Sequence, residues 1–254
     1  MKTSILSRNK ILRAGLAILF WLLVWQGLAW WVGLGLLLPE PLTVGRTLLS
    51  LIRTPGFWSP IWFSLLGVLA GFLSGVVIGS LLAVFTWASP LADALFSPLL
   101  RLVRTAPVAS FIILALIWLH TRTVPAVIAA LMVIPVLGSS TKTALEETNP
   151  SLLEMAKVYR FSRFRKFRLI YLPQVLPQWT AACATAMGLA WKAGMAAEVI
   201  AQPSPAMGTN LYRSRLLLNT EGVFAWTVLI ILLSFLLERV FLFAMTRLGR
   251  RYNP

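Results

Sequence analysis

The sequence predicts an all-α, polytopic membrane protein with about six transmembrane helices. Hydrophobic residues occupy 58% of the 254 positions and charged residues only 12%. The mean hydropathy of +0.81 lies far above that of an ordinary soluble domain. Because a chain that crosses a bilayer must satisfy its backbone hydrogen bonds internally, long apolar stretches indicate helices.

Six apolar windows come close to the length of about 20 residues that a spanning helix needs. They cover residues 16–38, 60–87, 99–119, 124–141, 179–201 and 224–246. A signal peptide also starts with basic residues, but its apolar region is only about 7–15 residues long, so we expect the first window to be a retained helix. Pro107 predicts a bend in the third window, and Pro125 and Pro135 predict bends in the fourth.

The formal net charge of +15 is informative through its position along the chain rather than as a sign of nucleic-acid binding. With a cytoplasmic N-terminus, the basic residues on the inner side lie before the first window, at Arg101 and Arg104, at 154–168 and after the last window. Cytoplasmic loops of membrane proteins carry an excess of Lys and Arg. The pattern therefore predicts that both termini and the 154–168 cluster lie in the cytoplasm.

Four glycines recur at every fourth position of the second window: Gly67, Gly71, Gly75 and Gly79. This spacing places them on one face of a helix, where the absence of side chains lets another backbone approach closely. We expect this face to pack against a helix. The sequence leaves open whether that helix belongs to the same subunit or to a second one.

A segment of about 35 residues between the fourth and fifth windows is too polar to span a bilayer. Asn149 or Ser151 can cap a short helix that starts near Pro150, and a break at 160–162 separates it from a second short helix that ends before Pro173. The stretch EMAKVYRFSRFRKFRLIYLPQVLP at 154–177 is strongly basic. Charge alone would predict a juxtamembrane segment that contacts anionic lipid.

The order of residue types in this segment resembles the EAA loop of bacterial ABC import permeases, whose pattern is EAA, x3, G, x9, I, x, LP. Here the pattern reads Glu154-Met155-Ala156, then Arg160 at the glycine position, then IYLP at 170–173. Other stretches resemble the branch that imports nitrate, taurine, alkanesulfonates and similar small molecules. They are LLPEPLTV at 37–44, RLVRTAPVAS at 101–110, WKAGMAAEVI at 191–200 and LLERVF at 236–241.

This resemblance implies a type I ABC importer permease of the bacterial inner membrane, with one domain over 1–254 and a cytoplasmic coupling loop at about 144–173. The implied partners are two ABC ATPase subunits, a second permease copy in a homodimer, an extracytoplasmic substrate-binding protein and the lipid bilayer, with no nucleic acid. The residues implied to couple to the ATPase are Glu154, Met155, Ala156, Tyr159, Arg160, Phe161 and Ser162.

The chain has no glycine-rich phosphate loop of the GxxxxGK[ST] kind. We therefore expect no catalytic residue, cofactor or metal in this chain, with ATP and Mg bound by the partner ATPase.

The loop departs from the family pattern at Met155 and at Arg160. Glycine adopts a left-handed backbone conformation at little cost, whereas another residue pays about 1 kcal/mol. Arg160 must accept this strain, or the turn must be built differently.

Lys192 lies within the fifth window, accompanied by Trp191, Met195 and Glu198. An ionisable residue inside a span is a functional candidate because burying its charge is costly. Lys192 either lines a pathway that favours an anion, or extends to the outer surface or to carbonyls of a neighbouring helix. Glu198 lies about 120° around the helix from Lys192, so we do not expect the two to pair.

These residues predict a permease subunit that imports a small polar, anionic solute. An energy-coupling transmembrane subunit is an alternative, but its Ala-Arg signatures do not occur in this sequence. A channel would conduct without ATP. A polytopic membrane enzyme would need a cluster of catalytic side chains, whereas the eight acidic residues are scattered over the loops and His120 is the only histidine.

Overall fold

The computed structural model describes residues 2–249, whose regular secondary structure is helical throughout. This confirms the all-α prediction. The contacts divide the chain into two compact units. One contains the residues up to Trp58 together with Asn210–Ile230, and the other contains Ser59–Thr209 together with the residues from Ile231 onward.

The first unit contains two complete helices and parts of two more. They are α1 (Lys2–Val32), α2 (Pro41–Ile52), the larger part of α10 (Met207–Leu216) and the first part of α11 (Thr220–Gly249). The indole Nε1 of Trp25 donates to the carbonyl of Pro39 at 3.1 Å, and its ring lies 5.8 Å from that of Phe224. These contacts hold the end of α1 against the turn before α2 and the start of α11.

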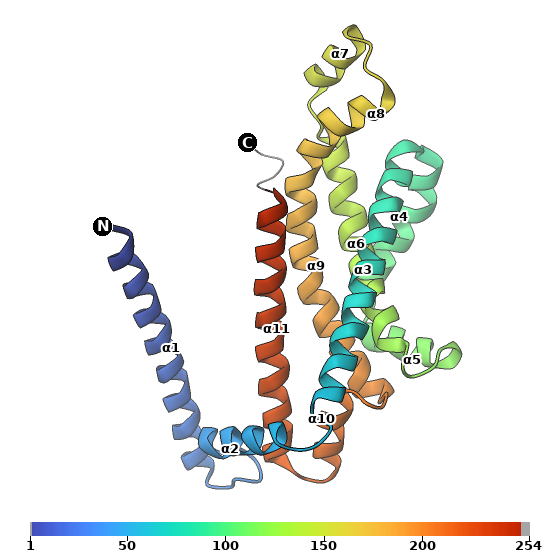
Figure 1. Ribbon diagram of the computed structural model, residues 1–254. Coiled ribbons are helices and arrows are strands. Elements are labelled where there is room, and N and C mark those ends of the chain that lie inside the picture. Colours follow the sequence, from blue (N-terminus) through green and yellow to red (C-terminus); the bar gives the residue numbers. More distant parts are fainter. Residues whose placement is uncertain (1, 250–254) are drawn as a thin grey trace. The chain divides into compact units, whose positions relative to one another are not determined.

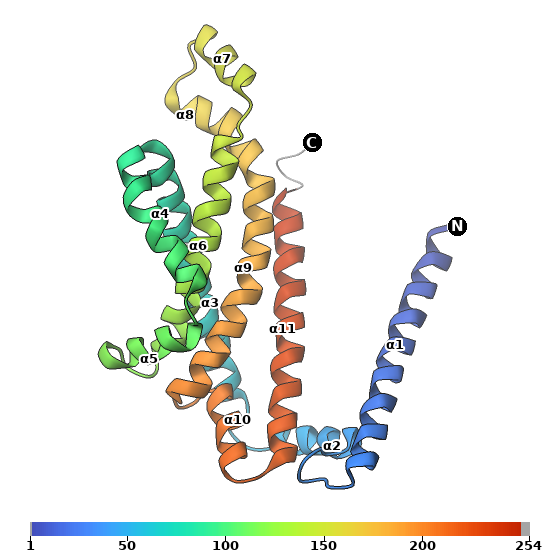
Figure 2. The same cartoon turned by 180° about the vertical axis from the view of Figure 1, so that it is seen from behind.

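The second unit contains a bundle of long helices and a loop with short ones (Figures 1 and 2). Besides the start of α10 and the second part of α11, it contains α3 (Trp58–Ala88), α4 (Pro90–Thr105), α5 (Val108–Trp118), α6 (Val124–Glu146), α7 (Pro150–Val158), α8 (Arg163–Lys166), the π-helix η1 (Phe167–Tyr171) and α9 (Leu172–Ala201). α6 and α9 form the most extensive helix pair and lie side by side in both views. α7 and α8 lie beyond their ends.

Four helical segments among the described residues are long and apolar enough to cross a membrane, and the pair α4 and α5 provides a fifth if it is counted as one broken span. The four segments are Gly15–Val32, Trp58–Ala88, Val124–Glu146 and Thr220–Ala244. α9 carries Lys192 and Glu198 and is not among them. Its role as a sixth span stays a prediction.

Prolines explain where the helices differ from the predicted windows. The bend predicted at Pro107 is confirmed, because α4 and α5 meet at an angle of 109° around this residue. Ala106 is extended there, as expected for a residue that precedes proline. The predicted bend at Pro125 is wrong: this residue lies in the first turn of α6, where a missing N–H costs nothing. Pro135 lies inside α6 without ending it.

Three of the four spaced glycines let α3 approach α6 closely. A Cβ atom added to Gly71 would lie 2.2 Å from the carbonyl oxygen of Ala126. Cβ atoms added to Gly75 and Gly79 would also come within 3 Å of atoms of α6. Gly67 has open space around it. The face of α3 formed by the last three glycines is therefore used for packing inside the chain.

We expect Gly71→Ala to destabilise the protein, because even one methyl group would overlap a backbone oxygen that cannot rotate away. Overpacking of this kind costs about 1–3 kcal/mol. The measurement is the thermal unfolding midpoint of the purified chain in detergent. Gly67→Ala is the matched control, since it adds the same methyl group to the same helix in open space. Equal midpoints for the two variants would contradict this assignment of the packing face.

Candidate functional site

The loop between α6 and α9 is tied to α9 by the residue just before α7. The side-chain oxygen of Asn149 accepts a hydrogen bond from the Ser151 N–H at 2.9 Å, and so caps α7. The Asn149 N–H in turn donates to the side-chain oxygen of Gln174 at 2.9 Å. Asn149, rather than Ser151, is therefore the capping residue.

The turn after α7 has the conformation that the family pattern assigns to glycine. Arg160 has a φ of 49°, in the left-handed region. The Phe161 N–H donates to the carbonyl of Ala156 at 2.9 Å, and the Arg160 N–H donates to that of Lys157 at 3.1 Å. These two bonds form a Schellman motif, the usual way to end a helix on a left-handed residue. Arg160 thus accepts the strain instead of avoiding it.

The second arm of the loop continues into α9 without a break. Ser162 caps α8 by accepting from the Arg165 N–H at 3.3 Å. The prediction that this helix ends before Pro173 is wrong, because η1 joins α8 directly to α9. Proline lacks the N–H that a regular α-helix would need. The wider π turn bonds the Leu172 N–H to Phe167 instead, and carries the chain past Pro173.

The loop exposes large apolar side chains. The exposed fractions of Val158, Tyr159 and Phe164 are 79%, 70% and 73%. Apolar groups at this exposure outside the spanning segments mark a surface for a partner. Ala156, predicted to contact the ATPase, is only 3% exposed, so its side chain is not part of this surface.

The remaining predicted coupling residues lie around this surface. Glu154 and Met155 are exposed on α7, Ser162 is exposed at the start of α8, and Phe161 is half-buried under the Arg165 guanidinium, which lies 5.2 Å from its ring. In the part of the chain that the structure describes, the Glu154 carboxylate makes no hydrogen bond or ion pair. It is therefore accessible to a partner.

The base of the loop contacts the bundle. Ile170 is buried, and the Tyr171 ring packs edge-on against Trp87 of α3, with ring centroids 5.3 Å apart. Below it, the Trp179 indole donates to Ser80 Oγ at 2.9 Å. A movement of the loop would therefore reach both α9 and α3.

The four pathway candidates on α9 lie in different environments. Trp191, Met195 and Glu198 are buried inside the chain, whereas Lys192 is exposed. Lys192 has no ion-pair or hydrogen-bond partner among residues 2–249. Of the four, it is the side chain still accessible to a solute or to a second subunit.

Glu198 is bonded by groups that the sequence did not indicate. Its Oε2 accepts from Ser64 Oγ at 2.8 Å and from the Gly208 N–H at 2.9 Å. Ser64 Oγ accepts from the Met207 N–H at 3.0 Å. As expected, Glu198 does not pair with Lys192; it joins α3, α9 and the start of α10.

Residues 75–252 match the family described as the binding-protein-dependent transport system inner membrane component. The chain belongs to this family of ABC importer permeases. It is 26% identical to the taurine transport system permease protein TauC of Escherichia coli (strain K12), over 86% of this chain and 80% of TauC. It is 24% identical to the putative aliphatic sulfonates transport permease protein SsuC of Bacillus subtilis (strain 168), over 81% of this chain and 75% of SsuC.

The permease also shares its fold with a chain of the MetNI methionine ABC transporter in an inward-facing conformation. The TM-score is 0.64 at 17% sequence identity, and the alignment covers 80% of the permease and 100% of that chain. This likeness confirms the predicted type I importer permease fold.

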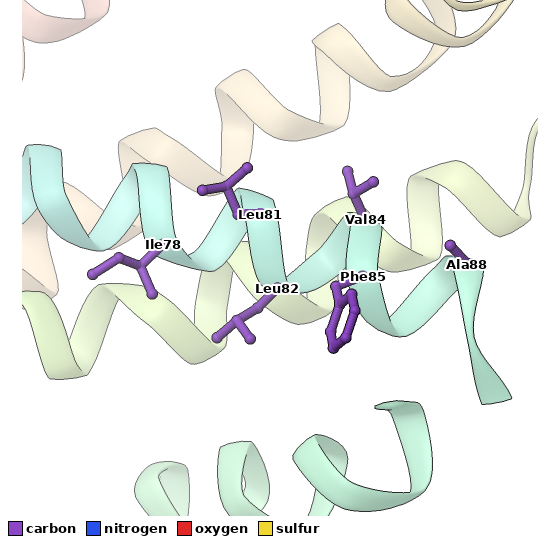
Figure 3. A pocket seen from close by; sticks show the side chains of 6 residues that line it. All are labelled: Ile78, Leu81, Leu82, Val84, Phe85 and Ala88. Carbon is purple, nitrogen blue, oxygen red and sulfur yellow. The ribbon is translucent and has the colours of Figure 1, made fainter. Parts of the chain in front are cut away.

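A hollow of about 590 Å³ on the permease surface is lined by apolar side chains (Figure 3). Its lining comes from α3 alone: Ile78, Leu81, Leu82, Val84, Phe85 and Ala88. A solute site needs a few polar groups to orient its ligand. This hollow is therefore not a candidate for the solute.

We expect Arg160→Gly to slow the local opening of the loop, because glycine relieves the left-handed strain. Arg160→Ala is the matched control, since it removes the same charge but keeps the strain. Relief of about 1 kcal/mol corresponds to about fivefold slower amide exchange in the glycine variant than in the alanine variant. Hydrogen exchange of a peptide that covers 154–165 measures this difference. Equal rates would show that the turn relaxes around an ordinary residue.

Proposed function

We propose that this permease imports a small anionic solute, which an extracytoplasmic binding protein delivers and two ABC ATPase subunits drive across the membrane. The observation that carries the proposal is the exposed apolar surface of the loop. The loop contains a hydrogen-bonded turn, and its base contacts α3 and continues into α9. A partner that closes against this surface would displace the ends of those helices. Transport then requires two conformations of the permease, inward-open and outward-open, and a partner that stabilises first one and then the other.

The basic loop supports a cytoplasmic position for this surface. Lys157, Arg160, Arg163, Arg165, Lys166 and Arg168 all lie in it. An excess of basic residues is typical of cytoplasmic loops, so the ATPase subunits would meet it from that side, with both termini in the cytoplasm of a bacterial inner membrane. We propose that the permease forms a homodimer and that residues 1–254 act as one permease domain with a coupling loop at 144–173.

The names of three relatives support an anionic substrate. TauC is named for taurine and SsuC for aliphatic sulfonates. A nitrate import permease protein, NrtB of Synechocystis sp. (strain ATCC 27184 / PCC 6803 / Kazusa), is 26% identical over 75% of this chain and 72% of its own. Lys192, exposed on α9, offers a positive charge that would attract such a solute.

We expect Val158→Asp to uncouple the permease without unfolding it, because its side chain is 79% exposed in the chain but would be buried against the ATPase. An unpaired carboxylate at a subunit contact costs several kcal/mol. The measurements are copurification of the ATPase and ATP-dependent uptake. Leu217→Asp is the control, since Leu217 has the same exposure but lies after α10. Normal copurification and uptake with Val158→Asp would refute the docking surface.

We expect Lys192→Met to lower uptake of an anionic solute at least tenfold while the binding protein still stimulates the ATPase. A single charge contact in a poorly hydrated pathway is worth about 1.4 kcal/mol or more. Lys192→Arg keeps the charge and should retain most of the uptake. The assay compares taurine, methanesulfonate and nitrate in proteoliposomes with all partners present. Unchanged uptake with methionine would assign Lys192 to the membrane surface, and a parallel loss of ATPase activity would assign it to the fold.

A further inference from the structure

A polar hollow of about 220 Å³ lies between α4 and α6. Its lining includes Ser97, Arg101, Arg104, Ser139, Lys142 and Glu146. The volume of one water in the liquid is about 30 Å³, so the hollow has room for an anion of a few heavy atoms with some water. Its charged and hydroxyl side chains distinguish it from the apolar hollow on α3.

Two polar contacts hold α4 against α6 on either side of the hollow. Near the start of α4, Asp93 Oδ1 lies 2.6 Å from Lys142 Nζ. At its other end, Arg104 Nη2 donates to the carbonyl of Pro135 at 3.2 Å and to Ser139 Oγ. Arg101 lies between these contacts along α4. The hollow is therefore part of the packing of two helices and not a gap between loose side chains.

The positive charges of this hollow are only partly compensated. Lys142 is paired with Asp93 and, at 3.6 Å, with Glu146. Arg104 donates only to neutral oxygens, and Arg101 makes no hydrogen bond or ion pair within residues 2–249, although it lies near enough to Asp93 for an electrostatic attraction. Neither guanidinium group thus forms an ion pair with a carboxylate in the described chain.

Two guanidinium groups that form no ion pair with a carboxylate are unfavourable in these surroundings. α4 and α5 together are apolar enough to form a broken membrane span. Charged side chains in such segments face a partner or a water-filled space, because exposing them to lipid is costly. The planar guanidinium group matches the oxygens of a sulfonate, carboxylate or phosphate and binds them through two hydrogen bonds.

We propose that Arg101 and Arg104 bind a small oxyanion in the hollow between α4 and α6. The oxyanion could belong to the transported solute or to the headgroup of an anionic lipid. If it belongs to the solute, the inference rests on the function proposed above. Basic pockets between membrane helices are known to hold both kinds of group.

The first experiment measures the thermal unfolding midpoint of the purified full chain in detergent during titration with sodium methanesulfonate. Sodium chloride at matched ionic strength is the reference. We expect a saturable rise in the midpoint, since a ligand that binds the folded state stabilises it. Arg101→Gln and Arg104→Gln should each require at least about tenfold more methanesulfonate for half of the rise.

Arg163→Gln is the matched control, because it removes one exposed charge outside the hollow. Arg104 also holds α6, so its variant could lower the starting midpoint. Arg101 makes no such bond, and its variant keeps the test decisive. No saturable rise in the wild type, or equal responses in Arg101→Gln and wild type, would overturn the proposal.

The second experiment separates the two sources by repeating the titration in nanodiscs of phosphatidylcholine, with and without phosphatidylglycerol. A lipid headgroup as ligand predicts that phosphatidylglycerol raises the wild-type midpoint, removes the methanesulfonate response, and has no effect on Arg101→Gln. A solute as ligand predicts the same methanesulfonate response in both lipids. Both experiments use binding without ATP, so a failure of ATP-driven uptake would refute the proposed function and leave this result unaffected.

Discussion

Close packing of small residues holds α3, α6 and α9 together, and the rest of the described Ser59–Thr209 segment depends on it. Lipid is as apolar as a leucine side chain, so helices in a bilayer associate through short-range van der Waals contact. Gly71 and Gly75 bring α6 against α3. A Cβ on Gly194 of α9 would lie 2.6 Å from Val68 Cγ2 of the same α3. Because the loop begins at the end of α6 and runs into α9, the packing of α6 and α9 on α3 also fixes the base of the loop.

The same packing decides which polar groups are buried. The Glu198 carboxylate is 1% exposed, and such a group without donors would cost several kcal/mol. Ser64 and the N–H at the start of α10 provide those donors, and free N–H groups at a helix N-terminus favour a negative charge. Glu198 therefore joins helices, whereas Lys192, on another side of α9, remains free for function. The sequence placed both in one group of pathway candidates, and the structure separates them.

The long helices and the break at Pro107 could be predicted from the sequence, because apolar length and proline chemistry are local properties. The burial of Ala156 could not, since it depends on tertiary contacts that the local sequence does not specify. The hydrogen-bond donors to Glu198 could not be predicted either. Ser64 is 134 positions away, and a single serine in an apolar window gives no sequence pattern that indicates its partner. The π turn at η1 also escaped prediction, although Pro173 indicated that a regular helix could not continue unchanged.

Arg160 shows how the loop keeps its geometry without its usual glycine. The left-handed conformation costs a non-glycine residue about 1 kcal/mol. The two hydrogen bonds of the turn contribute about 0.5–1.5 kcal/mol each, which is enough to offset that strain. Glycine is thus favourable at this position but is not required for the turn to form. Since the Arg160 side chain is exposed, the permease retains the turn of the family pattern and adds a positive charge where that pattern has no side chain at all.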